Sequence, residues 1–223
     1  RGYRSAQWKE RKKLLKDFGL NIYRPKRPGA FWVRTTGLGS YREVGRACHL
    51  VTTNESKIMI DVGVNIANDS DPMPYFTAPE ALPMEKMDAV ILTHAHLDHA
   101  GMLPVLFRYG YRGPVFCTPP TRDMMLLLQS DYLKIGGAEG KRAPYDMEDI
   151  RTCMRHVVDV EWGQTVDITP DVKMTFHNAG HILGSSSVHL HVGDGKHNIV
   201  FSGDQKYEKS WLFDAANTRF PRC

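Results

Sequence analysis

The sequence contains neither a long apolar run nor a closely spaced pair of cysteines. Its four cysteines, at positions 48, 117, 153 and 223, form no Cys-x-x-Cys motif, a pattern that favours reduced thiols in a cytoplasmic protein. No segment approaches the roughly 18 apolar residues of a membrane span, so we expect no membrane association. The chain begins Arg1-Gly2-Tyr3 without an initiator methionine or a signal peptide, and we expect it to begin inside a longer protein.

Charge is distributed unevenly along the 223 residues. Apolar residues make up 42% and charged residues 24%, as in ordinary globular proteins. Residues 1–29 hold ten Lys or Arg and two acids, a net charge of +8; the whole chain is +4, so the rest carries −4. We therefore expect a basic helix and linker over 1–29 and one domain over 30–223. A basic arm on a mildly acidic body suggests contact with a polyanion, and a solvated surface helix is the alternative.

Hydrophobic periodicity predicts two sheets flanked by helices. The first helix is expected over 5–18, with Trp8, Leu14, Leu15 and Phe18 on its apolar side and an end at Gly19. A loop is expected over 69–83 and a flexible break over 136–140, and Leu127 is expected in the core. Further helices are expected over about 98–109, 122–135 and 147–156. Strands are expected over 31–36, 47–53, 57–61, 88–92, 115–118, 164–168, 172–178, 187–192 and 198–202.

The densest group of polar residues lies between positions 93 and 101, directly after an apolar run that predicts a buried strand. His94 and His96 are two residues apart, so in an extended chain they point the same way. Asp98 and His99 follow at the start of a predicted helix, where the turn redirects them toward a neighbouring metal. Imidazole and carboxylate at these spacings suit two zinc-type ions. The alternative, a polar helix cap, leaves unpaired buried groups that would each cost about 2 kcal/mol or more.

Three further polar residues stand beside glycine at the ends of predicted apolar strands. Asp61 precedes Val62-Gly63, His181 lies between Gly180 and Gly184, and Asp204 follows Gly203. Functional side chains are often carried by loops that a rigid frame holds in place. We therefore expect these three residues to be functional, with the same chemical character as the histidine cluster.

Taken in order, these residues and the 94–99 cluster resemble the leading motifs of the metallo-β-lactamase superfamily. The segments 39–46, 180–185 and 201–207 look like those of the β-CASP RNA nucleases, and closely like the archaeal homologues of the cleavage and polyadenylation specificity factor (CPSF) endonuclease. The resemblance covers about residues 5–223. It implies an α/β (α+β) fold, an αββα sandwich that is incomplete here because the β-CASP domain and the C-terminal strands are absent.

The resemblance also implies a centre with two zinc ions. The first ion would be held by three histidines, namely His94, His96 and His181. The second would be held by Asp98 and His99, with Asp204 bridging both ions. Asp98 could also orient or deprotonate the attacking water. Asp61 would accept a hydrogen bond from a ligand imidazole and so fix its tautomer.

The chain departs from the family at its end, Cys223, because family members continue into the β-CASP domain. That domain supplies a histidine proposed as general acid and a further histidine ligand of the second zinc. We therefore expect weak occupancy of the second metal site here, and nuclease activity in the complete protein rather than in this fragment.

The implied activity is zinc-dependent RNA endonuclease cleavage, with or without 5′-to-3′ exonuclease activity, in RNA 3′-end processing or transcription termination. A metal-bound hydroxide would attack the phosphodiester. Single-stranded RNA would be the partner, contacted by Lys9, Arg11, Lys12 and Lys13 of the basic arm, and a homodimer of the full-length protein is left open. Two alternatives remain: a small-molecule metallo-hydrolase of the glyoxalase or lactonase type, and a non-catalytic RNA-binding subunit. Salt-sensitive RNA binding and metal stoichiometry would separate the three.

Overall fold

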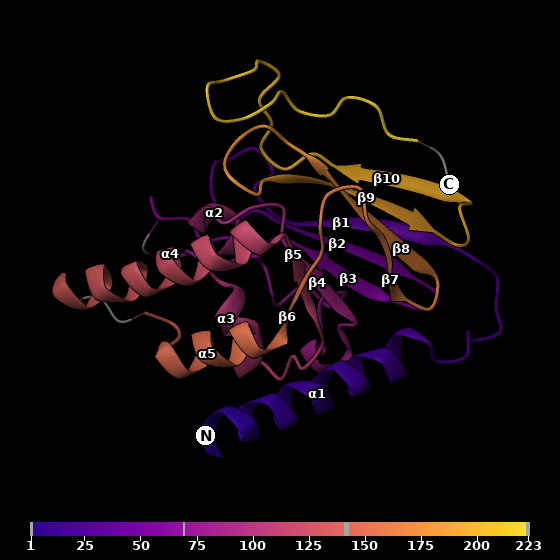
Figure 1. Cartoon of the computed structure of the whole chain (residues 1–223), viewed down its shortest axis with the longest axis horizontal. Helices are drawn as coiled ribbons and strands as arrows, with labels where there is room; N and C mark the ends of the chain where they lie inside the picture. The colour runs from indigo at the N-terminus through magenta and orange to yellow at the C-terminus, as the bar shows by residue number, and fades with distance from the viewer. Residues whose placement is uncertain (1, 69, 141–142, 222–223) are drawn as a thin grey trace.

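A computed structural model describes residues 2–68, 70–140 and 143–221 of the chain. The expectations that involve Arg1, Asp69 and Cys223 lie outside these residues. The structure is built from two β-sheets and a set of helices, and it confirms the expected α/β class (Figure 1).

The larger sheet, sheet A, is mixed. Its first three strands pair antiparallel, and parallel pairing begins between the third and fourth strands and continues to the edge. The last strand of sheet A was not expected from the sequence, because it follows helix α5 (Met147–His156) without a break. In spatial order, which here equals chain order, the strands are β1 (Val33–Gly39), β2 (Cys48–Thr53), β3 (Lys57–Ile60), β4 (Ala89–Ile91), β5 (Val115–Cys117) and β6 (Val157–Asp159).

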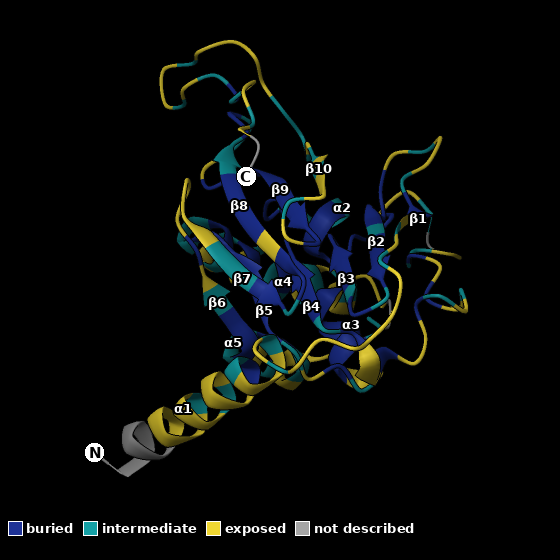
Figure 2. Ribbon diagram, turned by 90° about the vertical axis from the view of Figure 1, so that its right-hand side faces the viewer, coloured by how far each residue is buried: buried dark blue, intermediate teal, exposed yellow. Residues whose placement is uncertain are grey.

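The smaller sheet, sheet B, is antiparallel and packs face to face on sheet A. Ile58 and Ile91 of sheet A share one buried core with Phe176 and Leu190 of sheet B. All four side chains are fully buried (Figure 2). In spatial order its strands are β10 (His197–Phe201), β9 (Ser186–Val192), β8 (Val172–Asn178) and β7 (Thr165–Thr169).

Helices cover the other face of sheet A and enclose a second core. Leu50, Met59 and Val90 of the sheet pack there with Leu106 and Ile150 of the helices. Three layers result: helices, sheet A and sheet B. The helices are α2 (Leu97–Ala100), α3 (Leu103–Arg108), α4 (Pro119–Ala138) and α5 (Met147–His156), with a 3₁₀ turn, η1 (Met84–Lys86), before β4.

Two expectations for α4 are wrong. The helix does not break at the glycines but continues through Gly136 to Ala138, because Tyr132 and Leu133, one turn earlier, pack against the core and offset the roughly 1 kcal/mol that each glycine costs a helix. Leu127 is 60% exposed rather than buried, and Met125 points into the core instead.

Helix α1 (Gly2–Ile22) crosses the end of the sandwich at which β3, β4 and β5 begin (Figure 1). It continues past the expected end at Gly19, and its expected apolar side is half wrong: Trp8 and Leu15 are exposed, whereas Leu14 is half-buried and Phe18 is buried against His156. Polar contacts also dock the helix, since the guanidinium of Arg11 donates to the carbonyls of Arg155 and Val157. Within the described residues, no helix is both long and apolar enough to span a membrane.

Candidate metal centre

The polar cluster lies at the carboxyl ends of the parallel strands β3 and β4. Asp61 follows β3 directly, and the segment from Thr93 to His99 follows β4 and runs into α2. In open α/β sheets this edge is where ligands bind, because the strands end there and their loops converge. Figure 1 shows α2 and this edge at the opposite end of the sandwich from α1.

Three histidine nitrogens converge on one point. Nε2 of His94 and Nε2 of His181 each lie 3.2 Å from Nδ1 of His96. A tetrahedral zinc ion with Zn–N bonds of about 2.05 Å would separate its nitrogen ligands by roughly 3.3 Å. The three rings therefore already have the spacing of a zinc site.

Asp204 completes this group from sheet B, where it follows β10. One ligand atom from each of four residues lies within 4.8 Å of the others, namely His94, His96, His181 and Asp204. The two oxygens of the Asp204 carboxylate face different sides: Oδ2 is 3.5 Å from His181 Nε2, and Oδ1 is 3.4 Å from His99 Nε2. A carboxylate in this position can join two metal ions.

The second half of the centre is more open. Asp98 Oδ2 lies 3.8 Å from His99 Nε2, and the Asp98 side chain is about one-third exposed. Among the described residues this half offers three donors, Asp98, His99 and the shared Asp204, to a second ion. The weak occupancy expected there stays a prediction.

A relay of hydrogen bonds behind the histidines sets their orientation. The buried carboxylate of Asp61 accepts from the backbone N–H of Thr93 and from its hydroxyl, each at 2.8 Å. It also lies 2.8 Å from Nδ1 of His99. Since a carboxylate only accepts, His99 donates through Nδ1 and turns Nε2 toward the centre. Asp61 therefore lies where the family resemblance places it.

Thr93, which the sequence patterns did not single out, fixes a second ring. Its hydroxyl has one proton, which it donates in a hydrogen bond to Asp61. The hydroxyl oxygen is 3.0 Å from Nδ1 of His94, so it accepts a hydrogen bond from the N–H at that position. Nε2 of His94 is then unprotonated and presents its lone pair to the centre. The only sequence signal for this role is that Thr93 stands between the strand and the first histidine.

The protonation states of the histidines differ between the two halves of the candidate metal centre. Burial, with the charge of nearby His99, lowers the pKa of His94 to about 3, and burial also lowers the pKa of His96. Burial opposes a charge on His99, but Asp61 and Asp204 outweigh it and raise the pKa of His99 to about 10. The hydrogen bond from His99 in turn lowers the pKa of Asp204 to about 2. A cation must therefore displace a proton from His99 but not from His94.

A cleft of about 510 Å³ opens onto this second half. Asp98, His99 and Asp204 form its polar wall, and Phe201 and His49 form another side. His96 and His181 do not line this cleft, and His96 lines a neighbouring hollow together with Leu97 and Asp98.

The basic arm is not near this cleft. Side chains of Lys9, Lys12 and Lys13 are exposed on α1, at the other end of the sandwich. The Arg11 side chain is half-buried, and its guanidinium donates hydrogen bonds to backbone carbonyls of α5 and β6. The structure thus groups the predicted metal ligands together and separates the predicted RNA contacts from them.

Replacing Thr93 with valine should lower zinc affinity about 10- to 100-fold, the usual cost of losing a partner that orients a ligand. Valine keeps the shape but leaves His94 Nδ1 and Asp61 without the shared hydroxyl. Competition titration with a chromogenic zinc chelator would measure the change, and Thr93→Ser, which retains the hydroxyl, is the matched control. Equal affinity in the valine and serine variants would contradict the relay.

Comparisons with known proteins agree with this geometry. A family model described as a metallo-beta-lactamase superfamily domain matches residues 50–219. Two archaeal relatives are named transcription termination factor FttA: one from Methanosarcina mazei is 53% identical over 96% of this chain, and one from Methanocaldococcus jannaschii is 49% identical over 98%. The matches cover 34% and 35% of those proteins, so the chain spans about a third of their length.

A solved structure from Enterococcus faecalis, titled a protein of unknown function, superposes with a TM-score of 0.55 at 15% identity. It covers 80% of this chain and 44% of that one, and at this identity it speaks for the fold alone. The family match spans β3, the histidine cluster, His181 and Asp204, which are the same elements that build the candidate centre. On sequence and architecture together, the chain belongs to the metallo-β-lactamase superfamily.

Proposed function

We propose that this chain forms the zinc-binding part of an RNA nuclease of the β-CASP type, acting in transcription termination or RNA 3′-end formation. The observation that carries the proposal is the convergence of three imidazole nitrogens, two of them 3.2 Å from the third, beside a carboxylate that faces two ways. The names of the relatives support a role at transcript ends. The narrower β-CASP and CPSF assignment rests on the flanking motifs.

In this proposal His94, His96 and His181 hold one zinc ion, Asp98 and His99 contribute to a second, and Asp204 serves both. When bound, zinc supplies Lewis acidity that polarises a phosphoryl oxygen and acidifies water. Asp98 faces the cleft and is partly exposed, so its carboxylate can accept a proton from the attacking water. Thr93 and Asp61 hold the rings in the tautomers that this arrangement needs.

Cleavage of 5′-labelled single-stranded RNA by zinc-loaded protein would test the proposal. We expect zinc-dependent products with the complete wild-type protein and none with its His96→Ala variant. Intact RNA after incubation with protein that binds its full zinc complement would argue against the nuclease. Turnover of a neutral thioester or lactone under the same conditions would favour the small-molecule hydrolase instead.

The arm makes a separate prediction. Three exposed lysines contacting phosphates would release counterions, each contributing about 0.7 to the slope of log affinity against log salt for a single strand. Replacing Lys9, Lys12 and Lys13 with glutamine should therefore flatten that slope by about 2. Fluorescence anisotropy at several salt concentrations would measure it.

The matched control replaces three exposed lysines elsewhere on the surface, namely Lys134, Lys173 and Lys209. An unchanged slope in the arm variant, or an equal change in the control, would indicate that α1 is an ordinary solvated helix that does not contact RNA. Arg11 is left unaltered in this experiment because its guanidinium docks the helix.

A further inference from the structure

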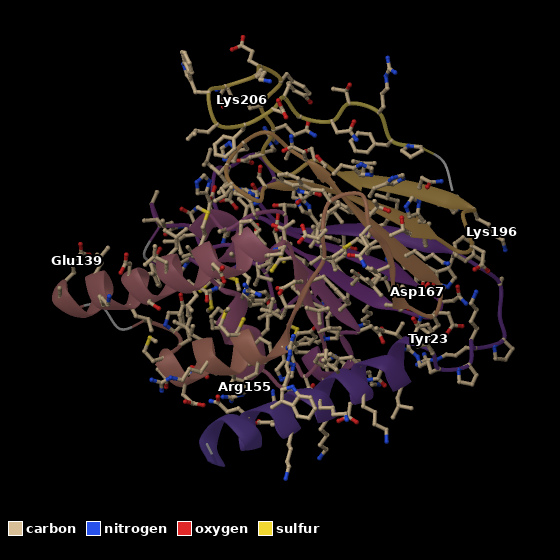
Figure 3. The ribbon with its side chains drawn as sticks, viewed as in Figure 1. Tyr23, Glu139, Arg155, Asp167, Lys196 and Lys206 are labelled. Atoms are coloured by element: carbon tan, nitrogen blue, oxygen red, sulfur yellow. The ribbon has the colours of Figure 1, made fainter. Side chains whose placement is uncertain are left out.

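A second hollow lies at the end of the sandwich opposite the metal centre. It has a volume of about 660 Å³ and is lined by residues that precede or begin strands, including Lys57 at the start of β3 and Asp88 just before β4. The metal centre follows the other ends of the same strands, a strand length of about 13 Å away. Figure 3 shows the same separation: Lys206, two residues after Asp204, is at one end and Tyr23, just after α1, is at the other.

The wall of this hollow is rich in cations around one aromatic side chain. We call this hollow the Trp32 pocket, after its tryptophan. Its defining residues are Arg24, Arg27, Trp32, Lys57, Lys86 and Arg112. Three acids also line it, but one of them, Asp88, is already paired with Arg24 at 2.9 Å. Five cations against three acids leave the pocket positive.

Several of these cations are held in place by neutral groups. Lys57 donates to the carbonyls of Glu80 and Leu82, both at 2.8 Å. Arg112 donates to two further backbone carbonyls, of Phe107 at 2.8 Å and Tyr111 at 2.6 Å. Carbonyl oxygens position a cation without cancelling its charge. Burial and the nearby charge of Lys86 lower the pKa of Lys57, as expected where like charges gather.

Trp32 gives the pocket an exposed aromatic surface. The indole is 43% exposed, although it directly precedes β1, and the guanidinium of Arg34 lies 5.8 Å from its ring. A large aromatic ring left open among fixed cations is the combination that binds single-stranded nucleic acid, because bases stack on the ring and phosphates meet the charges. A duplex offers no free base faces to such a ring.

We propose that the Trp32 pocket is a second contact site for single-stranded RNA, with one base stacked on Trp32 and adjacent phosphates at Lys86 and Arg27. The inference rests on the proposed function for the identity of the polymer. It adds a site that is remote from the metal centre and adjoins the end of α1, which contributes Asn21 to the pocket. One RNA strand would thus be held away from the point of cleavage.

Binding of a fluorescein-labelled 12-nucleotide oligouridylate, measured by anisotropy in EDTA, would test the site. EDTA keeps the metal centre out of the measurement, so failure of the nuclease proposal and failure of this one are distinguishable. We expect Trp32→Ala to weaken binding at least five-fold, equivalent to about 1 kcal/mol, the lower end of a base–aromatic stack. Trp32→Phe should stay within two-fold of wild type, and Lys86→Gln should reduce the salt slope by about 0.7.

The matched control joins an exposed tryptophan and an exposed lysine that lie outside the pocket, Trp211→Ala with Lys134→Gln. Thermal melts would check that Trp32→Ala folds, and the phenylalanine variant keeps the test decisive if it does not. Unchanged affinity in Trp32→Ala, or an equal loss in the control, would overturn the proposal. So would a loss in Lys86→Gln alone, since that would indicate a general polyanion surface without stacking.

Discussion

Replacing Asp204 with alanine is expected to abolish stable metal binding by the centre and, with it, any RNA cleavage. Among the described residues, Asp204 is the one carboxylate that faces both His181 and His99, at 3.5 and 3.4 Å. Losing a partner that only orients a ligand costs about 10- to 100-fold in affinity, so loss of a shared ligand should exceed 100-fold. Elemental analysis after dialysis, with a chelator titration, would measure the effect.

Asp214→Ala is the matched control, since Asp214 lies ten residues further on and pairs with Lys209 at the exposed surface. It should bind zinc like the wild type. If Asp204→Ala retained the zinc content and affinity of the wild-type chain, the ligand assignment would be wrong. Loss of the second ion only would show that the three histidines suffice for the first.

Gly63→Ala is expected to destabilise the fold by about 3 kcal/mol or more, the upper end of overpacking effects. A Cβ on Gly63 would lie 1.6 Å from the carbonyl oxygen of Asp98 and 2.7 Å from the backbone nitrogen of Ala47. Backbone atoms cannot rotate away as a side chain can. The chain after β3 would have to separate from α2, which carries Asp98 and His99.

Chemical denaturation and thermal melts would measure this change, with a Tm lower by roughly 6–12 °C for a chain of this size. Gly137→Ala is the matched control, because a Cβ there meets nothing within 4 Å. It lies inside α4, where alanine in place of glycine should stabilise the helix by about 0.5–1 kcal/mol. Equal melting temperatures for the two variants would refute the close approach at Gly63.

The sequence predicts the strands around the centre well, because these strands are apolar runs that end in histidine or aspartate. The apolar run predicts a buried strand, and the polar residue at its end predicts a functional site. Strand β8 was expected over 172–178, as observed, and helix α5 over 147–156, as observed. The expected histidine and aspartate ligands come together from two sheets. The spacing of residues along the sequence could not predict the role of Thr93, because that role depends on a hydrogen bond to Asp61, which is 32 positions away.

The errors have the same physical origin. Local composition suggested a break at Gly136-Gly137 and an apolar stripe on α1, but packing decided both. The core holds α4 past its glycines, and α1 is docked by Phe18 and Arg11 rather than by Trp8 or Leu15. The position of the basic arm relative to the cleft likewise depends on the topology of the whole chain and not on any one segment.

Asp204 lies in the loop that follows the last strand of sheet B, whereas His94 and His96 lie in a loop of sheet A more than a hundred residues earlier. An ion held between them would act as a cross-link that closes a very long loop, as a disulfide does in proteins that have one. Three of the four cysteines are buried as free thiols, so they supply no such link. Resistance to unfolding should then rise with the logarithm of free zinc.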